Sequence, residues 1–470
     1  MSYFKNQYDV IIIGGGVGGL VCGCYLVKAG MKVLIVEKND KPGGYCSSFT
    51  RSGFSFDACV HSLGSLRQDG ILTRALQELN LDTSFKIKRY EPSDVIVSSD
   101  CRVCFWNELN KTTQEFQNSF PKNAKHIEKL FNFFINCHGA TFNSLRKISF
   151  KKLLDQYFKN KKLQAILSLP VLGNIGLSSS KVSAFTATAL YREFMFDGGY
   201  YPENNMQTLP DALTENFKTL GGDMLSSRLV KGIRVKNNEI KGVILEKDEF
   251  MPARYVVSAV DAHQTFLELL GESVLNKPSI NKLNKLTPSL SMFVLYLGLD
   301  RTLDSLPPQC SNLWSLPYYN VEKLYNSVKN GYIPEPTWYL MHTSLDKKTL
   351  VILTSAPFKN EKYWNSHKDN FSENIIKKTE EIIPGIKKSI VVSEIATPST
   401  LCKRTLNYNG AAYGLARTPS QLSELMFSQV ISIKNLYLAG HWVALFQGIP
   451  GVVYLSRDIA KIILRRKKYE

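Results

Sequence analysis

Near the start of the chain, the pattern of hydrophobic and polar positions predicts a strand, a helix and a second strand. A β-branched apolar run over 10–13 and another over 33–36 each have the length of a buried strand. Residues 17–29 between them read as a helix, which Gly30 ends. Two buried strands joined by a helix are typical of a βαβ unit with parallel strands.

The turn between the first strand and the helix consists almost entirely of glycine. Residues 14–19 read Gly-Gly-Gly-Val-Gly-Gly and contain the G-x-G-x-x-G spacing of a dinucleotide-binding turn, with Gly18 as a further glycine. Gly14 permits the tight turn, Gly16 lets a pyrophosphate approach the backbone, and Gly19 lets the helix lie close to the sheet. The helix N-terminus then offers N–H groups and a positive dipole end to the phosphates.

An acidic residue, Glu37, follows the second strand. Its carboxylate can accept hydrogen bonds from a ribose, and it disfavours the extra phosphate of NADP. Together with both strands, the helix and the trailing Gly43 and Gly44, the glycine motif predicts a dinucleotide site. The alternative is a glycine-rich turn that holds no ligand.

A similar pattern returns in the middle of the chain. A helix is expected over 209–220, because Gly221 and Gly222 end an amphipathic run there. Strands are then expected over 226–235, 239–246 and 253–260.

Two further apolar segments complete the predicted elements. Residues 290–299 are too few to cross a membrane and read as a buried strand. Residues 435–442 read as a strand that ends in a glycine, and residues 448–451 precede a final helix.

These elements predict an α/β fold with a discontinuous nucleotide domain. We expect a Rossmann-like domain made of residues 1–75, 201–262 and 426–470, with α+β substrate-domain material inserted at 76–200 and 263–425. The insertions would let a substrate domain close over a cofactor held by the first domain.

Composition indicates a folded protein of moderate size. The chain has 470 residues, of which 44% are hydrophobic and 21% charged, so two or three subdomains are expected. Its apolar runs are shorter than the ~20 residues of a membrane helix, and its first residues do not resemble a signal peptide. We therefore expect a cytoplasmic protein.

The net charge of +17 is large enough to suggest an anionic partner. We expect no nucleic-acid partner, because no nucleic-acid motif accompanies the charge. An anionic membrane surface is the other candidate, and residues 147–163 place Phe150, Leu153 and Phe158 on one stripe with lysines opposite. This segment either lies in a membrane interface or packs as a surface helix on the protein's own core.

Neither cysteine nor histidine spacing predicts a metal site. Cys101 and Cys104 form a CxxC pair within an alternating stretch, and no second pair lies at zinc-ribbon spacing, so two strand cysteines are expected. The seven histidines show neither HxxxH nor HxH spacing.

Five blocks of sequence, in order along nearly the whole chain, resemble one flavoprotein family. This is the phytoene desaturase, carotenoid isomerase and retinol saturase group, whose relatives are the amine oxidases. The two more specific blocks are the glycine motif over 14–44 together with residues 54–58, and residues 436–451. The weaker blocks between them lie at 199–213, 221–259 and 397–414.

The resemblance implies the two-dinucleotide-binding-domain flavoprotein fold and a non-covalent FAD. In that family, the acid at Glu37 would bind the adenosine ribose, Val230 would contact the adenine, and Gly440 would lie by the flavin or its ribityl chain. The helix N-terminus at Gly448 would face the flavin pyrimidine edge and stabilise the charge of reduced flavin. The implied FAD contacts are Gly14, Gly16, Gly18, Gly19, Glu37, Lys38, Gly43, Gly44, Val230, Gly440, Gly448 and Ile449.

The resemblance also implies a substrate class. Family substrates are typically long apolar polyenes drawn from a membrane, so we expect an apolar small-molecule substrate, an apolar tunnel and a peripheral membrane surface. The expected reaction is desaturation, saturation or cis–trans isomerisation of carbon–carbon bonds. The alternatives are an oxidase of amines or amino-acid-derived groups, which would need an aromatic cage beside the flavin, and a flavin-binding scaffold without catalysis.

Two histidines are candidates for acid–base catalysis beside the flavin. His61 follows a strand that the family brings toward the flavin, and His441 comes directly after Gly440. Each could instead be a structural histidine that is hydrogen-bonded to its surroundings. Tyr413 and Trp442 either line the flavin face or belong to the core.

Overall fold

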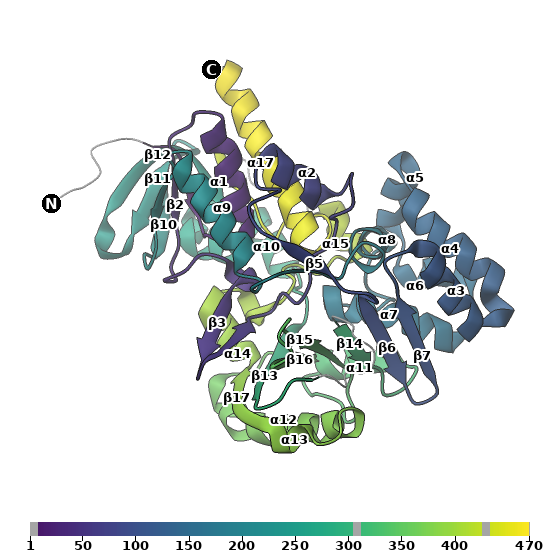
Figure 1. Ribbon diagram of the computed structural model, residues 1–470. Coiled ribbons are helices and arrows are strands. Elements are labelled where there is room, and N and C mark those ends of the chain that lie inside the picture. Colours follow the sequence, from purple (N-terminus) through teal and green to yellow (C-terminus); the bar gives the residue numbers. More distant parts are fainter. Residues whose placement is uncertain (1–7, 304–311, 425–432, 470) are drawn as a thin grey trace.

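The computed structural model describes residues 8–303, 312–424 and 433–469, and two seven-stranded sheets organise it. In Figure 1 the first sheet lies at the upper left with helices α1, α9 and α17, and the second lies below the centre. The helices α3 to α6 form a lobe at the right (Figure 1). This arrangement confirms the predicted α/β fold with a Rossmann-like domain.

The first sheet has a parallel centre and an antiparallel edge. In spatial order its main path is β10 (Val230–Lys236), β11 (Glu239–Leu245), β12 (Phe250–Ser258), β1 (Tyr8–Ile13), β2 (Val33–Val36) and β9 (Asp223–Leu225). Strand β18 (Leu436–Leu438) pairs in parallel with the end of β12. Three distant stretches of sequence therefore form one sheet, as expected for a discontinuous domain, while the domain boundaries themselves stay a prediction.

The second sheet is almost entirely antiparallel and is built from the inserted segments. Its strands in spatial order are β17 (Ile390–Ala396), β13 (Ser291–Leu299), β16 (Thr349–Ala356), β15 (Tyr339–Thr343), β14 (Asn312–Ser315), β6 (Asp94–Ser98) and β7 (Cys101–Phe105). Every residue of β13 is buried, which confirms the prediction for the apolar run 290–299. Cys101 and Cys104 lie on β7, as predicted for two strand cysteines.

Three helices pack around the first sheet, and the others belong mainly to the inserted segments. Gly19 and Gly23 bring α1 close to the sheet and to α9, because a side chain at either would meet atoms of Gly14 or Phe217. The helices are α1 (Val17–Lys28), α2 (Ile71–Glu78), α3 (Leu109–Ser119), α4 (Ala124–Asn136), α5 (Gly139–Ser144), α6 (Phe150–Tyr157), α7 (Lys161–Ile175), α8 (Ala184–Leu190), α9 (Thr208–Thr219), α10 (Lys277–Lys285), α11 (Val321–Lys329), α12 (Glu361–Ile382), α13 (Ile386–Ser389), α14 (Pro398–Thr405), α15 (Pro419–Glu424) and α17 (Gly448–Tyr469).

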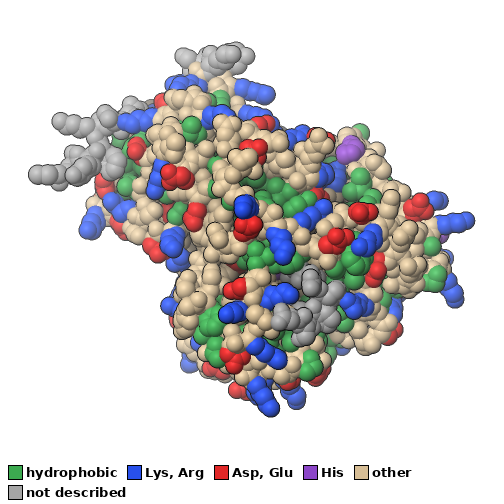
Figure 2. Space-filling view, in the orientation of Figure 1, with side chains coloured by type: hydrophobic (Ala, Val, Ile, Leu, Met, Phe, Trp, Pro, Cys, Tyr) green, Lys and Arg blue, Asp and Glu red, His purple; other side chains and the backbone are tan. Residues whose placement is uncertain are grey.

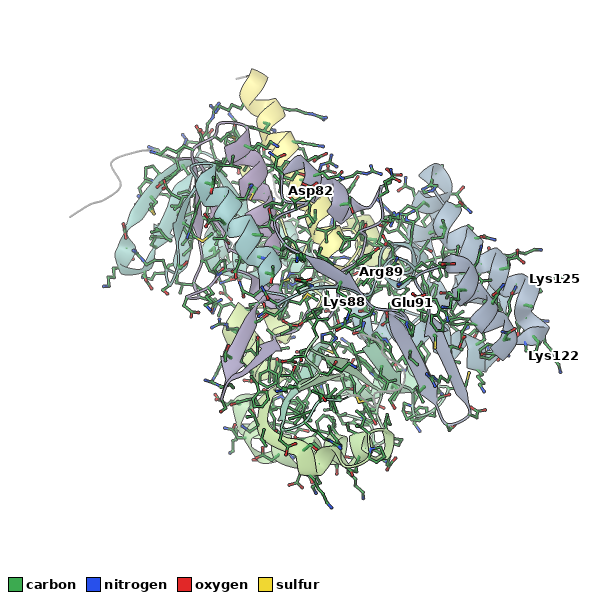
Figure 3. All side chains as sticks on the ribbon, viewed as in Figure 1. Asp82, Lys88, Arg89, Glu91, Lys122 and Lys125 are labelled. Atoms are coloured by element: carbon green, nitrogen blue, oxygen red, sulfur yellow. The ribbon has the colours of Figure 1, made fainter. Side chains whose placement is uncertain are left out.

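Two small antiparallel pairs connect these parts. One is the hairpin of β3 (Ser48–Arg51) and β4 (Phe54–Asp57), and the other joins β5 (Ile87–Arg89) to β8 (Tyr200–Pro202). Figure 3 labels Lys88 and Arg89 on β5, where the chain passes toward the second sheet. The Arg89 guanidinium lies 4.6 Å from the ring centroid of Tyr200, which holds β5 against β8.

The basic segment 147–163 packs on the protein itself. It forms two helices, α6 and α7, because the chain turns after Tyr157 and the Asn160 side chain caps α7. The expectation of one continuous helical stripe is therefore corrected. Phe150, Leu153 and Phe158 are all buried in the main core, which is the arrangement expected for a surface helix on its own core.

Charged side chains are mixed over the molecular surface. Figure 2 shows lysine and arginine side chains interspersed with acidic ones over the face that it draws. Lys122 and Lys125 lie at the outer end of the helical lobe (Figure 3). Over the described parts of the chain, we find no helix with the length and apolar character needed to span a bilayer.

Candidate active site

A cavity opens at the carboxyl ends of the parallel strands in the first sheet. Gly14 follows β1, Glu37 follows β2, Ala259 follows β12 and Gly440 follows β18, and all four line the cavity. This edge of an open α/β sheet is where such folds bind their ligands. The inserted segments supply the opposite wall, so the cavity lies between the two parts of the molecule.

The glycines of the first turn have different roles in forming this cavity. Gly14 has φ +98°, a conformation that other residues rarely adopt. A Cβ at Gly19 would lie 2.0 Å from the carbonyl oxygen of Gly14, and a Cβ at Gly18 would lie 2.8 Å from the Cα of Gly440. A Cβ at Gly16 would meet only the Cα of Gly44, at 4.0 Å, so this position faces open space in the cavity.

The loop at Gly43 and Gly44 closes over the glycine turn. The Gly43 amide donates to the carbonyl oxygen of Gly15 at 2.9 Å, and both loop glycines have positive φ, +132° and +60°. Gly43 and Gly44 line the cavity beside Gly16. Peptide groups without side chains therefore form this part of the cavity wall, which lets a pyrophosphate approach the backbone.

Glu37 is held in place at the end of β2. Its side chain is buried, with 6% exposed, and its two oxygens accept hydrogen bonds from the backbone amides of Gly15 at 2.7 Å and Asn39 at 2.8 Å. A carboxylate oxygen can accept more than one hydrogen bond, so a ribose hydroxyl can also bind there. Lys38 lines the same end of the cavity, and burial lowers its pKa.

The last predicted block supplies the other end of the cofactor wall. Helix α17 begins at Gly448 itself, and Gly448, Ile449 and Val452 line the cavity. The sequence pattern predicted that the helix begins after residues 448–451, but it begins one turn earlier. Pro450 does not prevent this, because proline is tolerated in the first turn of a helix. The helix N-terminus therefore faces the cavity with its positive dipole end.

The structure brings nearly all predicted cofactor residues to one cavity. Gly19 is the exception, since it lies between α1 and β1 and acts on the site through helix packing. The open position at Gly16, the buried carboxylate of Glu37 and the start of α17 fit the pyrophosphate, ribose and flavin portions of FAD. The predicted residues on the lining are Gly14, Gly16, Gly18, Glu37, Lys38, Gly43, Gly44, Val230, Gly440, Gly448 and Ile449.

The inserted segments, together with Cys59 of the first domain, give the cavity a mainly apolar wall. Helix α8 continues into a π-helical turn over Tyr191–Met195, which carries Phe194 to the cavity. Burial raises the pKa of the Cys59 thiol to about 12, so this thiol stays protonated. We call this surface the apolar wall, and its residues are Cys59, Ala189, Leu190, Phe194, Met292, Leu353, Ala412 and Tyr413.

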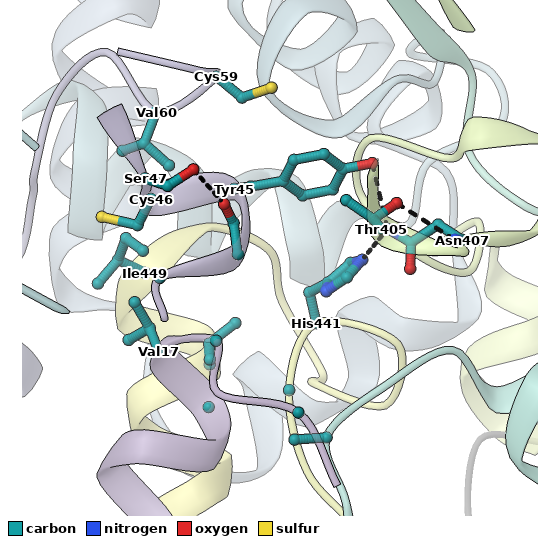
Figure 4. A pocket seen from close by; sticks show the side chains of 18 of the residues that line it. Val17, Tyr45, Cys46, Ser47, Cys59, Val60, Thr405, Asn407, His441 and Ile449 are labelled. Carbon is teal, nitrogen blue, oxygen red and sulfur yellow. Dashed lines mark hydrogen bonds between the residues drawn. The ribbon is translucent and has the colours of Figure 1, made fainter. Parts of the chain in front are cut away.

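An asparagine that the sequence analysis missed organises the centre of the site. Asn407 accepts a hydrogen bond from the Trp442 indole at 2.9 Å and donates to the Tyr45 hydroxyl at 3.1 Å. Figure 4 shows Tyr45, Asn407 and His441 pointing toward one another. Asn407 lies within the weak block 397–414, but no local pattern marks it as a site residue. Trp442 is buried behind Asn407 and does not line the cavity, so it belongs to the core.

His441 lines the cavity, and a buried cation lies behind it. Burial and the nearby Arg417 lower the pKa of His441 to about 3, so the ring is neutral at physiological pH. Arg417 is fully buried and donates to the carbonyl oxygens of His441 at 2.7 Å and Leu415 at 2.8 Å. A neutral ring donates a hydrogen bond at one nitrogen and accepts one at the other, which suits it to orienting a cofactor.

His61 lines the cavity beside the apolar wall. Its Nδ1 atom lies 3.0 Å from Oδ1 of Asn312, and its ring contacts Phe194 edge to face with 5.9 Å between centroids. Burial and the neighbouring His342 lower the pKa of His61 to about 3. The two predicted histidines therefore lie on the same cavity as the cofactor residues, while a catalytic role for either stays a prediction.

Comparison with known proteins identifies the family. The sequence profile described as "Flavin containing amine oxidoreductase" matches residues 17–464. All-trans-retinol 13,14-reductase of Danio rerio is 24% identical, over 99% of this chain and 87% of its own length. Chloroplastic prolycopene isomerase of Daucus carota is 26% identical over 96% and 79%, and 4,4'-diapophytoene desaturase of Methylomonas sp is 23% identical over 98% and 96%.

A solved structure supports the same fold. Wild-type putrescine oxidase bound to putrescine superposes with a TM-score of 0.70, at 18% identity, over 98% of this chain and 99% of its own. The predicted resemblance to the carotenoid desaturase, isomerase and retinol saturase group is thereby confirmed, as is the predicted FAD. The chain belongs to the family of flavin-containing amine oxidoreductases and is a FAD-dependent oxidoreductase.

Proposed function

We propose that this enzyme desaturates, saturates or isomerises carbon–carbon double bonds in a long apolar substrate of the polyene or isoprenoid type. The observation that carries the proposal is the apolar wall on the substrate side of the FAD site. The three relatives named above act, by their names, on retinol, prolycopene and diapophytoene, which are substrates of this kind. FAD supplies the two-electron redox chemistry when bound, and the protein binds and orients the apolar chain.

The charges that line the cavity favour an apolar substrate over an amine. Among the described lining residues, the acidic side chains are Glu37 and Glu193, and both have partners. Glu37 accepts hydrogen bonds from Gly15 and Asn39, whereas Glu193 forms ion pairs with Arg67 at 2.9 Å and Arg192 at 2.8 Å. A substrate ammonium group would enter the cavity without an available carboxylate, which is unfavourable for a buried charge.

Anaerobic mixing of candidate substrates with the enzyme holding oxidised FAD, and separately with chemically reduced FAD, tests the proposal. All-trans-retinol, prolycopene and diapophytoene form one panel, and putrescine and cyclohexylamine form the other. We expect a polyene to be converted to a product with a changed number or geometry of double bonds, identified by chromatography and mass spectrometry. Bleaching of the flavin by an amine, with no conversion of any polyene, would instead establish the amine oxidase alternative.

A substitution in the apolar wall sharpens this test. Ala189 is fully buried and lines the cavity, so Ala189→Leu should occupy space that the substrate needs. We expect the KM for the polyene to rise at least about tenfold, because even one methylene in an apolar pocket has effects of that order and leucine adds three carbons, while the FAD Kd stays unchanged. Ala140→Leu, the same change at an exposed position of α5, is the matched control.

We also propose that the enzyme works in the cytoplasm at a membrane surface, from which it takes its substrate. The net charge of +17 supports attraction to anionic lipids. Co-sedimentation with vesicles tests this: binding to phosphatidylserine vesicles that weakens with salt is expected, and equal behaviour toward neutral vesicles would refute an electrostatic attachment.

A further inference from the structure

A chain of buried hydrogen bonds leads from the second sheet to His61. Strands β6 and β14 pair in parallel, and their register places Asp94 opposite Asn312. Both side chains are fully buried. The Asp94 carboxylate accepts hydrogen bonds from the Asn312 side-chain amide at 3.0 Å and from the Trp314 indole at 2.7 Å.

These contacts determine which way the Asn312 amide points. A carboxylate only accepts hydrogen bonds when it is ionised, so Asn312 must turn its NH₂ group toward Asp94. Burial raises the pKa of Asp94 to about 6, which still leaves it ionised at neutral pH. The amide oxygen of Asn312 then faces His61, 3.0 Å from Nδ1.

The orientation of Asn312 in turn selects the tautomer of His61. An amide oxygen has no hydrogen to donate, so the contact with Nδ1 is a hydrogen bond only if Nδ1 carries the proton. In a neutral imidazole the other nitrogen, Nε2, then holds a free electron pair. His61 lines the cavity and Asn312 does not, so the hydrogen bond at Nδ1 is made on the side of the ring that faces the protein.

We propose that Asp94 and Asn312 are positioning residues that hold His61 as the Nδ1–H tautomer, so that Nε2 is the hydrogen-bond and proton acceptor for the substrate. The role of Nε2 in the reaction rests on the proposed function, whereas the tautomer of His61 does not. It adds two residues of the second sheet to the site, and neither lies in a sequence block that marks the FAD-binding domain.

The surroundings of His61 keep its ring neutral and fixed. Its edge-to-face neighbours are Phe194 and Trp314, with centroids 5.9 and 6.3 Å away, and the His342 ring lies at 6.1 Å. Asn174 lines the same cavity, and its side-chain amide donates to the carbonyl oxygen of Pro170 at 3.0 Å. The ionisable groups nearest to the ring are therefore His342 and, through Asn312, the Asp94 carboxylate.

The proton step assigned to His61 is balanced as follows. A substrate C–H bond breaks, the proton forms an N–H bond with the Nε2 electron pair, and the C–H electron pair becomes the second bond of the new C=C. The neighbouring carbon must lose a hydride for this second bond to form, and FAD, when bound, would supply that two-electron oxidation. In the reverse direction, Nε2–H returns the proton to carbon. A weak base is sufficient, because the loss of a hydride leaves positive charge on the neighbouring carbon and the polyene. The C–H bond beside that charge is strongly acidic.

Nitrogen NMR of the FAD-loaded protein labelled with ¹⁵N-histidine tests the tautomer without any substrate. The chain has seven histidines, and His61→Gln identifies the His61 signals by their loss. We expect a protonated Nδ1 and an unprotonated Nε2 at neutral pH. A proton on Nε2 instead would overturn the proposal, whatever the enzyme's activity.

A variant at position 312 separates positioning from general damage. Asn312→Leu removes the acceptor and should give a mixture of His61 tautomers. Asn374→Leu, at a half-buried asparagine that donates to Glu335, is the matched control. If Asn312→Leu folds and keeps the wild-type tautomer, Asn312 does not position His61.

Steady-state kinetics then link the tautomer to the reaction. We expect His61→Gln to lower kcat about 100-fold or more, and Asn312→Leu to lower kcat with little change in KM, because acid–base groups contribute about 10²–10⁴-fold. If the tautomer is as expected but His61→Gln keeps the wild-type kcat, the assignment of Nε2 as the proton acceptor is wrong. If no polyene is converted by the wild type, the proposed function fails while the NMR result still stands.

Discussion

Gly16 and Gly19 lie three residues apart in one turn, but alanine at one should impair a different property of the protein from alanine at the other. Gly16 is the N-cap of α1, with φ −69° and ψ 172°, a conformation that alanine adopts without strain. A Cβ there points into open cavity space, whereas a Cβ at Gly19 would lie 2.0 Å from a backbone oxygen. We therefore predict that Gly16→Ala impairs FAD binding and that Gly19→Ala impairs folding.

The contacts give approximate magnitudes for both effects. Gly16→Ala should lower the free energy of unfolding of the apo-protein by at most about 1 kcal/mol, since alanine is a slightly poorer N-cap than glycine. It should weaken FAD about 10–100-fold, because losing a charge-assisted hydrogen bond to phosphate costs about 1.5–3 kcal/mol. Gly19→Ala should cost about 3 kcal/mol or more, because α1 must move away from β1.

Urea denaturation of the apo-protein and calorimetric titration with FAD measure the two quantities separately. Gly30→Ala is a control with open space around its Cβ, although its φ of +79° carries a modest strain of its own. The reasoning is refuted if Gly16→Ala destabilises the apo-protein as much as Gly19→Ala does, or if Gly16→Ala binds FAD with the wild-type Kd.

Three further predictions concern the charged and titratable groups of the site. Glu37→Gln should weaken FAD about 10-fold or more in the same titration, because a neutral amide is a poorer acceptor for a ribose hydroxyl and for the Gly15 amide. The pKa of His61 is about 3 in the folded protein against about 6.5 when unfolded, so the unfolded state takes up the proton first and stability falls as pH drops below about 6.5. His61→Gln should therefore reduce the loss in unfolding free energy between pH 7 and pH 5 by about 2 kcal/mol, and an unchanged pH dependence in urea melts would contradict this. Arg417→Met should raise the pKa of His441, because the buried cation disfavours a second positive charge, and an NMR titration that shows no rise would exclude that coupling.

The parts of the fold that were predictable are those whose signal is local. The strand–glycine–helix–strand unit, α9, the strands β10 to β12 and the buried β13 each carry a clear period or a punctuating glycine within a few residues. The segment 147–163 was harder, because its apolar stripe continues past Tyr157 although the chain turns there. The break depends on the Asn160 cap and on packing, which a periodic pattern does not reveal.

The residues of the site also divide into those that a local motif predicts and those that it does not. Gly16, Glu37 and Gly440 were predictable because each lies within a contiguous motif that has a physical reason for its spacing. Asn407 and Asn312 were not, since their importance arises from partners that are distant in sequence: Trp442 and Tyr45 for one, Asp94 and His61 for the other. Such hydrogen bonds exist only once the strands have paired, so no local pattern marks them.

The composite first sheet also constrains how the protein is made. Its central strands β1 and β2 emerge early from the ribosome, but β12 and β18, which complete the sheet, follow more than 200 and 400 residues later. Contacts between such distant segments carry a large loop-closure cost and slow folding. The edge of β1 therefore stays uncovered until β12 is available, and the end of β12 stays unpaired until β18 follows. This protein should depend on chaperones during synthesis, and it can acquire FAD only as one of its last folding steps.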